Sequence, residues 1–218
     1  MTIPETATRF AELMAVIRGR RSVRAFLPDP VPTDAIRRAI DAAGWAPSPH
    51  GTQPWRFAVL ESRASREKLA DAMSTTWRAQ LALDGQDEAI IARRLANSRD
   101  RLLTPPVVAI LCLYLGNAHD YPDADRQASE ELMAVQSLGA AAQNFLLALE
   151  AEGLNAGWMC APLFVPELVR TTLGLPEGLI PHAMFPIGRM ASPPKVRPRI
   201  APEDLVAAWF ADEDIPNP

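Results

Sequence analysis

Two short segments near the start of the chain carry residue types that suit a phosphate group and a flat ring. They are R-R-S-V-R-A-F at residues 20–26 and A-P-S-P-H-G-T-Q-P-W at residues 46–55, about one helix-length apart. A phosphate ester carries close to two negative charges near neutral pH, and guanidinium forks satisfy it better than isolated ammonium groups do. The first segment supplies this chemistry within one turn of chain, through Arg20, Arg21, Ser22 and Arg24. We expect a phosphate site there, with a solvated basic surface patch as the alternative.

The second segment has too much proline for regular secondary structure. Proline fixes φ, and the Ser, Thr and Gln side chains have a short polar reach, so the stretch can present polar groups to the edge of a heteroaromatic ring. An ordinary structured loop is the alternative interpretation. Near the other end of the chain, K-V-R-P-R at residues 195–199 offers a second pair of cations for the phosphate, Lys195 and Arg197.

Composition limits the classes of function. The chain has 218 residues and 48% hydrophobic content, enough to bury a sizeable core as one domain over residues 1–218. Its formal net charge is −4, so a general electrostatic attraction to nucleic acid or anionic lipid is not expected. The binding partner should be a small molecule held in a local pocket.

The cysteines, the first residues and the length of the apolar runs indicate the compartment and whether a metal site is expected. Cys112 and Cys160 are the only cysteines, and without a C-x-x-C spacing or neighbouring histidines they predict neither a disulfide scaffold nor a metal site. The start M-T-I-P-E-T-A-T-R-F lacks the basic head and apolar run of a signal peptide. We also expect no membrane span, which needs about 18 uncharged apolar residues in a row. A reducing cytoplasm is the predicted location.

Helices and apolar runs alternate along the chain and predict one α+β domain. Helical spacing predicts a helix over 7–19 that leads into the arginine segment, and a second over 33–43 that Thr33 caps. The run V-V-A-I-L-C-L-Y-L at 107–115 is apolar throughout and predicts a central strand covered on both faces. The other predicted elements are strands at 56–60, just after Gly153 and at 183–188, helices at 63–83, 86–103 and 166–173, and an amphipathic end with Leu205, Trp209 and Phe210.

The longest predicted element is a helix over residues 127–151. Small residues at 139–142 make its middle narrow enough for another helix to approach closely. We expect it to be the central core helix, and its opposite face has few charges and suits contact with the same helix of a second subunit. Apolar residues recur along its inner side at three- and four-residue steps, namely Leu132, Val135, Leu138, Ala142, Phe145 and Leu149.

The order of these motifs resembles the FMN-dependent nitroreductase family. It runs R-R-S-x-R-x-F, A-P-S followed by Q-P-W, G-L-N-A-G-W-M before a small-residue turn, P-I-G, and a terminal K-x-R. The likeness extends from about residue 15 to 200. Within the family, A-P-S-P-H-G-T-Q-P, W-R-A-Q-L-A-L-D-G and A-H-D-Y-P-D-A are most similar to the nitroreductase-like C-terminal domain of the ligases that attach glutamates to the bacterial deazaflavin coenzyme.

The resemblance implies a three-layer fold around a mainly antiparallel sheet, in an intertwined homodimer with two FMN sites at the subunit interface. It implies NADPH or NADH as the electron donor in ping-pong kinetics. The acceptor would be an electron-poor small molecule, either a dehydro precursor of a deazaflavin coenzyme or a nitroaromatic or quinone. The flavin would carry the chemistry, so no side-chain acid or base is expected to be indispensable.

The resemblance also implies residue roles, carried over position by position. The ribityl phosphate would lie on Arg20, Arg21, Ser22 and Arg24, with Lys195 and Arg197 beside them. The second subunit would supply the residues that lie against the isoalloxazine, namely Pro47, Ser48 and Gly51. The turn at Cys160 and Ala161 would offer a backbone N–H to the reactive nitrogen of the ring.

Two positions depart from the family pattern. Gly51 stands where many members have an Asn that contacts the pyrimidine edge of the flavin, and His50, Gln53 or backbone groups are candidates to replace it. Cys160 stands where Gly is common, and we interpret it as a small buried hydrophobe rather than a redox group. His119 and Asp120 are expected to order a loop, with acceptor binding as the alternative.

Two other functions stay open on the sequence alone. One is oxygen-dependent fragmentation of the flavin ring, as in the benzimidazole-forming relatives of the family. The other is a non-catalytic module that binds a flavin or deazaflavin without turnover.

Overall fold

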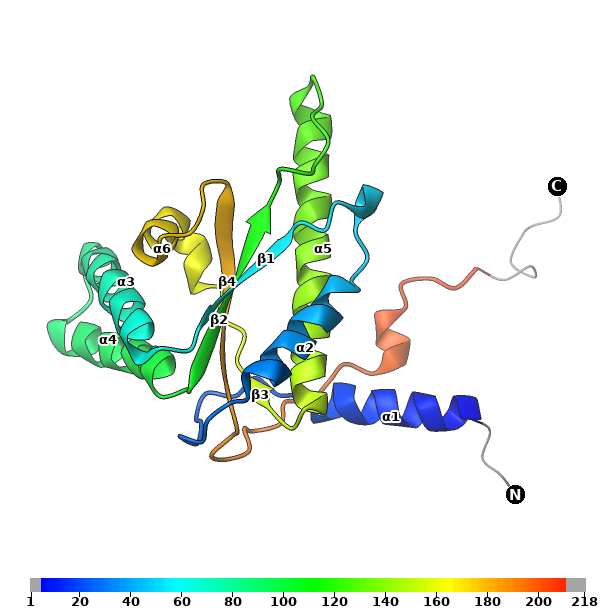
Figure 1. The fold of residues 1–218 in the computed structure, drawn as a ribbon, viewed down its shortest axis with the longest axis horizontal. Helices are drawn as coiled ribbons and strands as arrows, with labels where there is room; N and C mark the ends of the chain where they lie inside the picture. Colours follow the sequence, from blue (N-terminus) through cyan, green and yellow to red (C-terminus); the bar gives the residue numbers. More distant parts are fainter. Residues whose placement is uncertain (1–4, 211–218) are drawn as a thin grey trace.

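The computed structural model describes residues 5–210, which contain a four-stranded antiparallel sheet with helices on both faces (Figure 1). Residues 1–4, part of the start that was predicted not to be a signal peptide, lie outside the described part. The spatial order of the strands is β1 (Trp55–Leu60), β2 (Val107–Tyr114), β4 (Leu179–Gly188) and β3 (Asn155–Ala156). β2 is buried at every position except Tyr114, so the prediction of a central strand covered on both faces is confirmed.

The sheet is the middle of three layers, because each face carries its own helices. Side chains of β2 alternate between the faces, with Leu111 in one core and Ile110 and Cys112 in the other, as the two-residue period of a strand requires. The first face is covered by α2 (Thr33–Gly44) and α5 (Ala124–Ala151), and the second by α3 (Arg63–Leu83), α4 (Glu88–Leu103) and α6 (Pro166–Leu173).

Two helix starts differ from the prediction because of local hydrogen bonds. Thr33 is the first residue of α2 and does not cap it; its hydroxyl donates to Glu61 Oε1 at 2.8 Å, and Pro32 precedes the helix. α5 begins at Ala124 instead of residue 127. The Asp123 side chain caps it by accepting a hydrogen bond from the Arg126 backbone N–H at 2.9 Å.

β4 is longer than predicted and begins at Leu179, because Leu113 and Tyr114 of β2 continue the pairing to Ile180 and Leu179. His182, which directly precedes the predicted strand at 183–188, therefore lies inside β4. Burial there lowers the pKa of His182, since the charged imidazolium is disfavoured away from water.

α5 is the central core helix, yet two of its predicted inward residues face outward. Leu138, Ala142, Phe145 and Leu149 are buried, whereas Leu132 and Val135 are 59% and 38% exposed. Figure 1 shows the N-terminal half of α5 projecting beyond the end of the sheet. Glu130 and Ala134 in the same turns are buried, so Leu132 and Val135 lie on the outward side of the helix.

α5 is the element that bears on the expectation of no membrane span. Residues 132–149 contain no charged side chain, and within residues 5–210 α5 is the one helix long and apolar enough to cross a bilayer. The core helix of a soluble protein can have the same length and apolar composition. The burial of its inner side against the sheet is the pattern of such a core helix.

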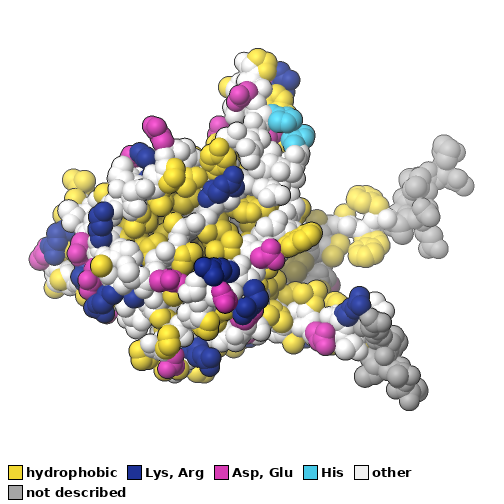
Figure 2. Space-filling model, viewed as in Figure 1, with side chains coloured by type: hydrophobic (Ala, Val, Ile, Leu, Met, Phe, Trp, Pro, Cys, Tyr) yellow, Lys and Arg dark blue, Asp and Glu magenta, His cyan; other side chains and the backbone are white. Residues whose placement is uncertain are grey.

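Two segments extend away from the three layers (Figure 1). α1 (Glu5–Gly19) confirms the predicted first helix, but Phe10 and Leu13 on it are 66% and 52% exposed. The C-terminal arm, residues 191–210, contains only the short 3-10 helix η3 (Pro202–Leu205), and the side chains of Trp209 and Phe210 are exposed. Figure 2 shows hydrophobic side chains along this arm and over the centre of the same face of the molecule.

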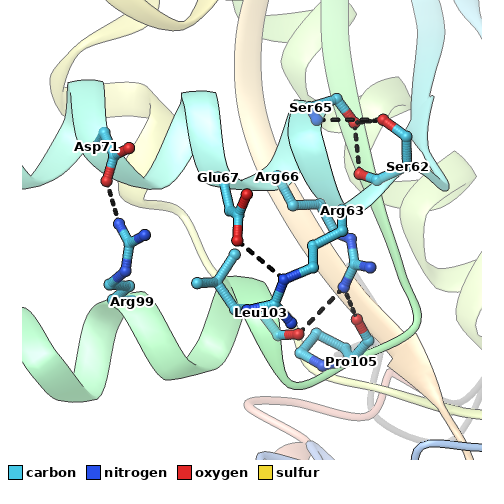
Figure 3. A network of polar contacts seen from close by, with 9 residues as sticks. All are labelled: Ser62, Arg63, Ser65, Arg66, Glu67, Asp71, Arg99, Leu103 and Pro105. Carbon is cyan, nitrogen blue, oxygen red and sulfur yellow. Dashed lines mark hydrogen bonds and ion pairs between the residues drawn. The ribbon is translucent and has the colours of Figure 1, made fainter.

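Arg66 joins α3 to the end of α4 in the polar network of Figure 3. Its side chain is 7% exposed, and its Nη1 donates to the backbone oxygens of Leu103, at 3.3 Å, and Pro105. Its Nε is buried and has no partner in the described structure, and burial lowers the pKa of Arg66. The guanidinium therefore satisfies the carbonyl groups with which α4 ends, at the cost of its own desolvation.

Replacing Arg66 by Met should destabilise the fold by about 1–3 kcal/mol, because buried carbonyl groups lose their donor while the apolar stem is kept. Urea unfolding measures the change. The matched control is Arg63→Met in the same turn of α3, whose exposed ion pair with Glu67 should contribute about 0.5 kcal/mol or less. Equal effects of the two substitutions would contradict the role given to Arg66.

Candidate functional site

The arginine segment at residues 20–26 is held along the outer edge of β3. Val23 N donates to Ala156 O at 3.1 Å, and Ala191 N donates to Ala25 O at 3.0 Å. Val23 and Phe26 are buried, whereas Ser22 and Arg24 are exposed, because neighbouring side chains of an extended chain point to opposite sides. Backbone hydrogen bonds therefore fix the segment and leave its polar side chains free for a ligand.

Gly157 makes this close approach possible. A Cβ at position 157 would lie 2.8 Å from the carbonyl oxygen of Val23 and 3.2 Å from Cγ of Pro186. Both neighbours belong to the backbone or to a rigid ring, so neither can move away cheaply. The glycine allows the arginine segment to lie directly against the sheet edge.

The structure gathers the predicted phosphate residues around one groove, which we call the arginine groove. Its volume is about 1020 Å³, and it lies between the end of α1, α5 and the C-terminal arm. Among residues 5–210, no Asp or Glu lines it. Arg20, Arg21, Ser22 and Arg24 line it from one side and Lys195 and Arg197 from the arm, together with Arg18, Arg199 and Gln143, which the sequence analysis did not single out.

Two arginines of the groove differ in what they bind. Arg21 folds back on the end of α1, where its Nη1 donates to the carbonyl oxygens of Arg18, Gly19 and Arg20. Arg20 has a buried Nε without a hydrogen-bond partner among the described residues. An orphaned buried N–H in a groove lined by cations suits an anionic ligand such as the phosphate of FMN. Arg21 instead caps a helix C-terminus, where cations are favourable.

A second, smaller cavity lies beside the groove, and we call it the edge cavity. Its volume is about 130 Å³, and it shares Ser22 and Arg24 with the arginine groove. Its remaining walls include Gly157, Trp158 and Met159 after β3, and Arg101 from the last turn of α4. Sequence reasoning missed Arg101, since nothing in the local pattern of a charged helix marks one arginine among several.

Cys160 and Ala161 directly follow the wall of the edge cavity. Cys160 precedes the short 3-10 helix η2 (Ala161–Phe164), and its side chain is exposed. The interpretation of Cys160 as a small buried hydrophobe is therefore wrong: the chain leaves the sheet after Met159, whose backbone N–H donates to Met184 O at 3.0 Å, and Cys160 has no layer above it. Cys112, by contrast, is buried in β2.

The two cysteines should differ sharply toward a thiol reagent. Burial raises the pKa of the Cys112 thiol to about 12, so it presents almost no thiolate at neutral pH. We expect iodoacetamide to modify Cys160 and leave Cys112 intact in the folded protein, as peptide mass spectrometry would report. Modification of both cysteines at similar rates would show that β2 is not the closed centre of the sheet.

The Pro-rich loop at residues 46–55 has an unusual backbone. His50, Gly51 and Gln53 have φ values of 55°, 67° and 45°, a left-handed conformation that His and Gln rarely adopt. The Ser48 hydroxyl supports the turn by accepting a hydrogen bond from Gln53 N at 3.2 Å. Strain of this kind is often found at ligand sites.

The structure does not bring Pro47, Ser48 or Gly51 to the arginine groove or the edge cavity of the same chain. Within one chain the loop instead packs near α5 and the segment after β2. Their predicted place against the ring, supplied by a second subunit, stays a prediction.

His119 orders the connection between β2 and α5. Its backbone N–H donates to Glu130 Oε1 at 3.2 Å, and its ring stacks on that of His50 with centroids 4.3 Å apart. The contact ties the strained loop to this connection. The expected loop-ordering role is confirmed for His119, whereas Asp120 makes no hydrogen bond or ion pair with the described residues that would support the same role.

Comparisons with known proteins agree with these observations. The profile described as "Nitroreductase family" matches residues 17–189. Nitroreductase NfnB of Mycolicibacterium smegmatis is 30% identical over 177 residues, covering 73% of this chain and 75% of the relative. A 5,6-dimethylbenzimidazole synthase of Rhodospirillum rubrum is 29% identical over 166 residues, covering 75% of each chain.

A solved structure shows the same fold. The BluB-like flavoprotein from Clostridium difficile 630 superposes with a TM-score of 0.76 at 24% identity, covering 91% of this chain and 99% of that one. The three-layer arrangement and the family profile that matches residues 17–189 agree. The chain belongs to the nitroreductase family.

Proposed function

We propose that this chain is an FMN-dependent oxidoreductase that transfers a hydride from NADPH or NADH to an electron-poor acceptor. The observation that carries the proposal is the arginine groove, with its many cations, no lining carboxylate and an orphaned Arg20 Nε. Arg20, Arg24, Lys195 and Arg197 would hold the ribityl phosphate, with the Ser22 hydroxyl as a further donor. Bound FMN would supply the hydride-carrying ring, which no amino-acid side chain provides.

The other site residues would orient the ring and not react themselves. Cys160 and Ala161 lie beside the edge cavity, so their backbone N–H groups are the proposed donors to the reactive ring nitrogen. Arg21 would act indirectly, by fixing the end of α1 from which Arg20 projects. The nicotinamide donor and the acceptor would use the same face of the bound FMN ring in turn, so each must leave before the other binds.

We propose that the working unit is a homodimer in the cytoplasm, with one domain per chain. The support is the apolar surface that one chain leaves exposed on α1, on the projecting half of α5 and on the C-terminal arm. A second copy would cover these surfaces and supply Pro47, Ser48 and Gly51 to the ring. The strained conformation of the loop that carries them supports this role.

A solved structure of a similar protein indicates which electron donor to test first. A structural neighbour with a TM-score of 0.68 at 24% identity is described as the FMN-dependent nitroreductase NfnB from Mycobacterium smegmatis in complex with NADPH; the match covers 93% of this chain and 99% of that one. By this likeness NADPH is the first donor to test. The proposed acceptors are nitroaromatics, quinones and a dehydro precursor of a deazaflavin coenzyme.

An anaerobic spectral titration tests the function. Protein loaded with FMN should lose the visible absorption of oxidised flavin when NADPH is added and regain it when a true acceptor follows. Bleaching without recovery by any proposed acceptor would limit the proposal to the first half-reaction. Protein that binds FMN and is not bleached by either nicotinamide donor would favour the non-catalytic module.

A second candidate function is oxygen-dependent fragmentation of the flavin. Two observations favour it, namely the 5,6-dimethylbenzimidazole synthase relative and the BluB-like neighbour. Admitting oxygen to the reduced, loaded protein distinguishes the two functions. Loss of flavin with formation of a benzimidazole supports fragmentation, whereas return of intact oxidised flavin supports the reductase.

A further inference from the structure

Glu130 on α5 is a buried carboxyl group that the proposed function has not used. Its side chain is 3% exposed, and its Oε1 accepts a hydrogen bond from His119 N at 3.2 Å. Its Oε2 is also buried and has no hydrogen-bond partner within residues 5–210. An unsatisfied buried oxygen lowers the stability of a fold, because its hydration is lost without replacement. Stability alone therefore does not explain why a carboxyl group occupies this position.

The hydrogen bond from His119 links Glu130 to the Pro-rich loop. The His119 ring stacks on the His50 ring, with centroids 4.3 Å apart and an angle of 15° between the planes. Figure 2 shows histidine side chains together on the projecting part of the molecule. A second contact joins the same two segments, since Asn117 Nδ2 donates to Thr52 O at 3.2 Å. Glu130 thus holds one end of a connection whose other end is the loop.

The loop needs such support because its backbone conformation is unfavourable by itself. His50 and Gln53 have φ values of 55° and 45°, which cost free energy in residues that carry a side chain. The ring stack holds His50, and the hydrogen bond from Asn117 holds Thr52, directly before Gln53. A loop without these contacts would relax to other conformations, and ordering it again would weaken the binding of a ligand.

We propose that Glu130 is a positioning residue of the flavin site: through His119 and His50 it fixes the loop that one copy of the chain supplies to the flavin of the other. This inference rests on the proposed homodimer and FMN site. Glu130 lines neither the arginine groove nor the edge cavity, so it acts through the loop. A loop that is already fixed loses less conformational entropy when FMN binds. The carboxyl group therefore raises the affinity for FMN while it lowers the stability of the fold.

The first test measures FMN affinity and stability in the variant Glu130→Leu. The dissociation constant of FMN should rise about tenfold, because a hydrogen bond that orders the loop is lost. The unfolding midpoint of the apoprotein in urea, at one protein concentration, should stay equal or rise, because the unsatisfied oxygen is removed.

Two further variants accompany Glu130→Leu. Glu130→Gln keeps an acceptor oxygen for His119 N and should restore most of the affinity. The control is Glu131→Leu, at an exposed position of α5 that lines neither cavity, and it should leave the affinity unchanged.

A mixed dimer tests whether the loop serves the other copy. One copy carries Arg20→Ala with Arg24→Ala, the other carries Glu130→Leu, and two different affinity tags select the dimers that contain both. One site of such a dimer combines intact phosphate residues with an intact loop, so we expect one FMN per dimer, bound with wild-type affinity. If Glu130 acted on the site of its own chain, both sites would be defective and neither would bind FMN tightly.

The outcomes that overturn the inference are distinct from failure of the proposed function. A parallel loss of FMN affinity and stability in Glu130→Leu would give the carboxyl group a purely structural role. Unchanged affinity would show that the loop keeps its shape without Glu130, and a mixed dimer without a tight site would place its effect in its own chain. If the wild-type protein binds no FMN, the proposed function itself fails, whatever Glu130 does.

Discussion

Replacing Arg20 and Arg24 together by Ala should raise the dissociation constant of FMN by about a hundredfold to ten-thousandfold. Each substitution removes a charge-assisted hydrogen bond worth about 1.5–3 kcal/mol, and each 1.4 kcal/mol is about tenfold in affinity. Arg20 should contribute much of this effect, since its buried Nε lacks any partner within residues 5–210. Quenching of flavin fluorescence during titration of the apoprotein measures the constant.

A loss of FMN affinity caused by removing positive charge must be distinguished from one caused by unfolding. The matched control is the pair Arg93→Ala and Arg94→Ala, two exposed arginines of α4 that line neither cavity. The control should bind FMN as the wild type does, and both double variants should keep the wild-type unfolding midpoint in urea. FMN affinity that survives the loss of Arg20 and Arg24 would place the flavin elsewhere on the chain.

Replacing Val135 by Asp should convert the proposed homodimer to monomer and reduce flavin binding severely. Val135 lies on the outward side of the N-terminal half of α5, where its side chain is 38% exposed. A carboxylate in an apolar interface loses its hydration without gaining a partner, and a symmetric dimer contains the substitution twice. Molar mass from light scattering and FMN affinity should fall together.

The control for this substitution is Leu83→Asp at the end of α3, where the leucine is 88% exposed. Figure 1 shows the α3–α4 pair on the opposite side of the sheet from α1 and the C-terminal arm. This variant should stay dimeric and bind FMN. A dimeric Val135→Asp protein that binds FMN as the wild type does would exclude this side of α5 from the interface.

The family and the three-layer α+β fold could be predicted from the sequence, because several motifs occur in a fixed order. The central strand was equally clear, since an uninterrupted apolar run between prolines has few alternatives. Helix starts were less certain. Thr33 has the residue type of a cap, but a hydroxyl that donates to Glu61 is not available to the helix.

The solvent exposure of individual side chains could not be predicted from the sequence. Periodicity assigned Leu132 and Val135 to the core, and the spacing is correct for a helix. Which side of these turns is covered depends on where the rest of the chain packs, as it does on Glu130 and Ala134, and no local pattern contains that information. Cys160 was assigned to the interior for a similar reason, because its apolar neighbours do not reveal where the chain leaves the sheet.

The phosphate residues of the candidate site were predictable and Arg101 was not. The segment from Arg20 to Arg24 is dense in one residue type, and backbone pairing to β3 determines which of its side chains face outward. Arg101 is far from it in sequence and lies on a helix rich in arginine. Only the packing of α4 on the sheet brings it to the edge cavity.

The central claim is that two copies of this chain share each flavin site, and one measurement tests it most directly. Sedimentation of the wild-type protein, followed through both protein and flavin absorbance while FMN is added, reports mass and occupancy together. We expect one FMN per chain, bound to the dimer, with FMN shifting any monomer toward dimer by mass action. A monomer that carries FMN as tightly as the dimer does, or a dimer that never takes up FMN, would contradict the account.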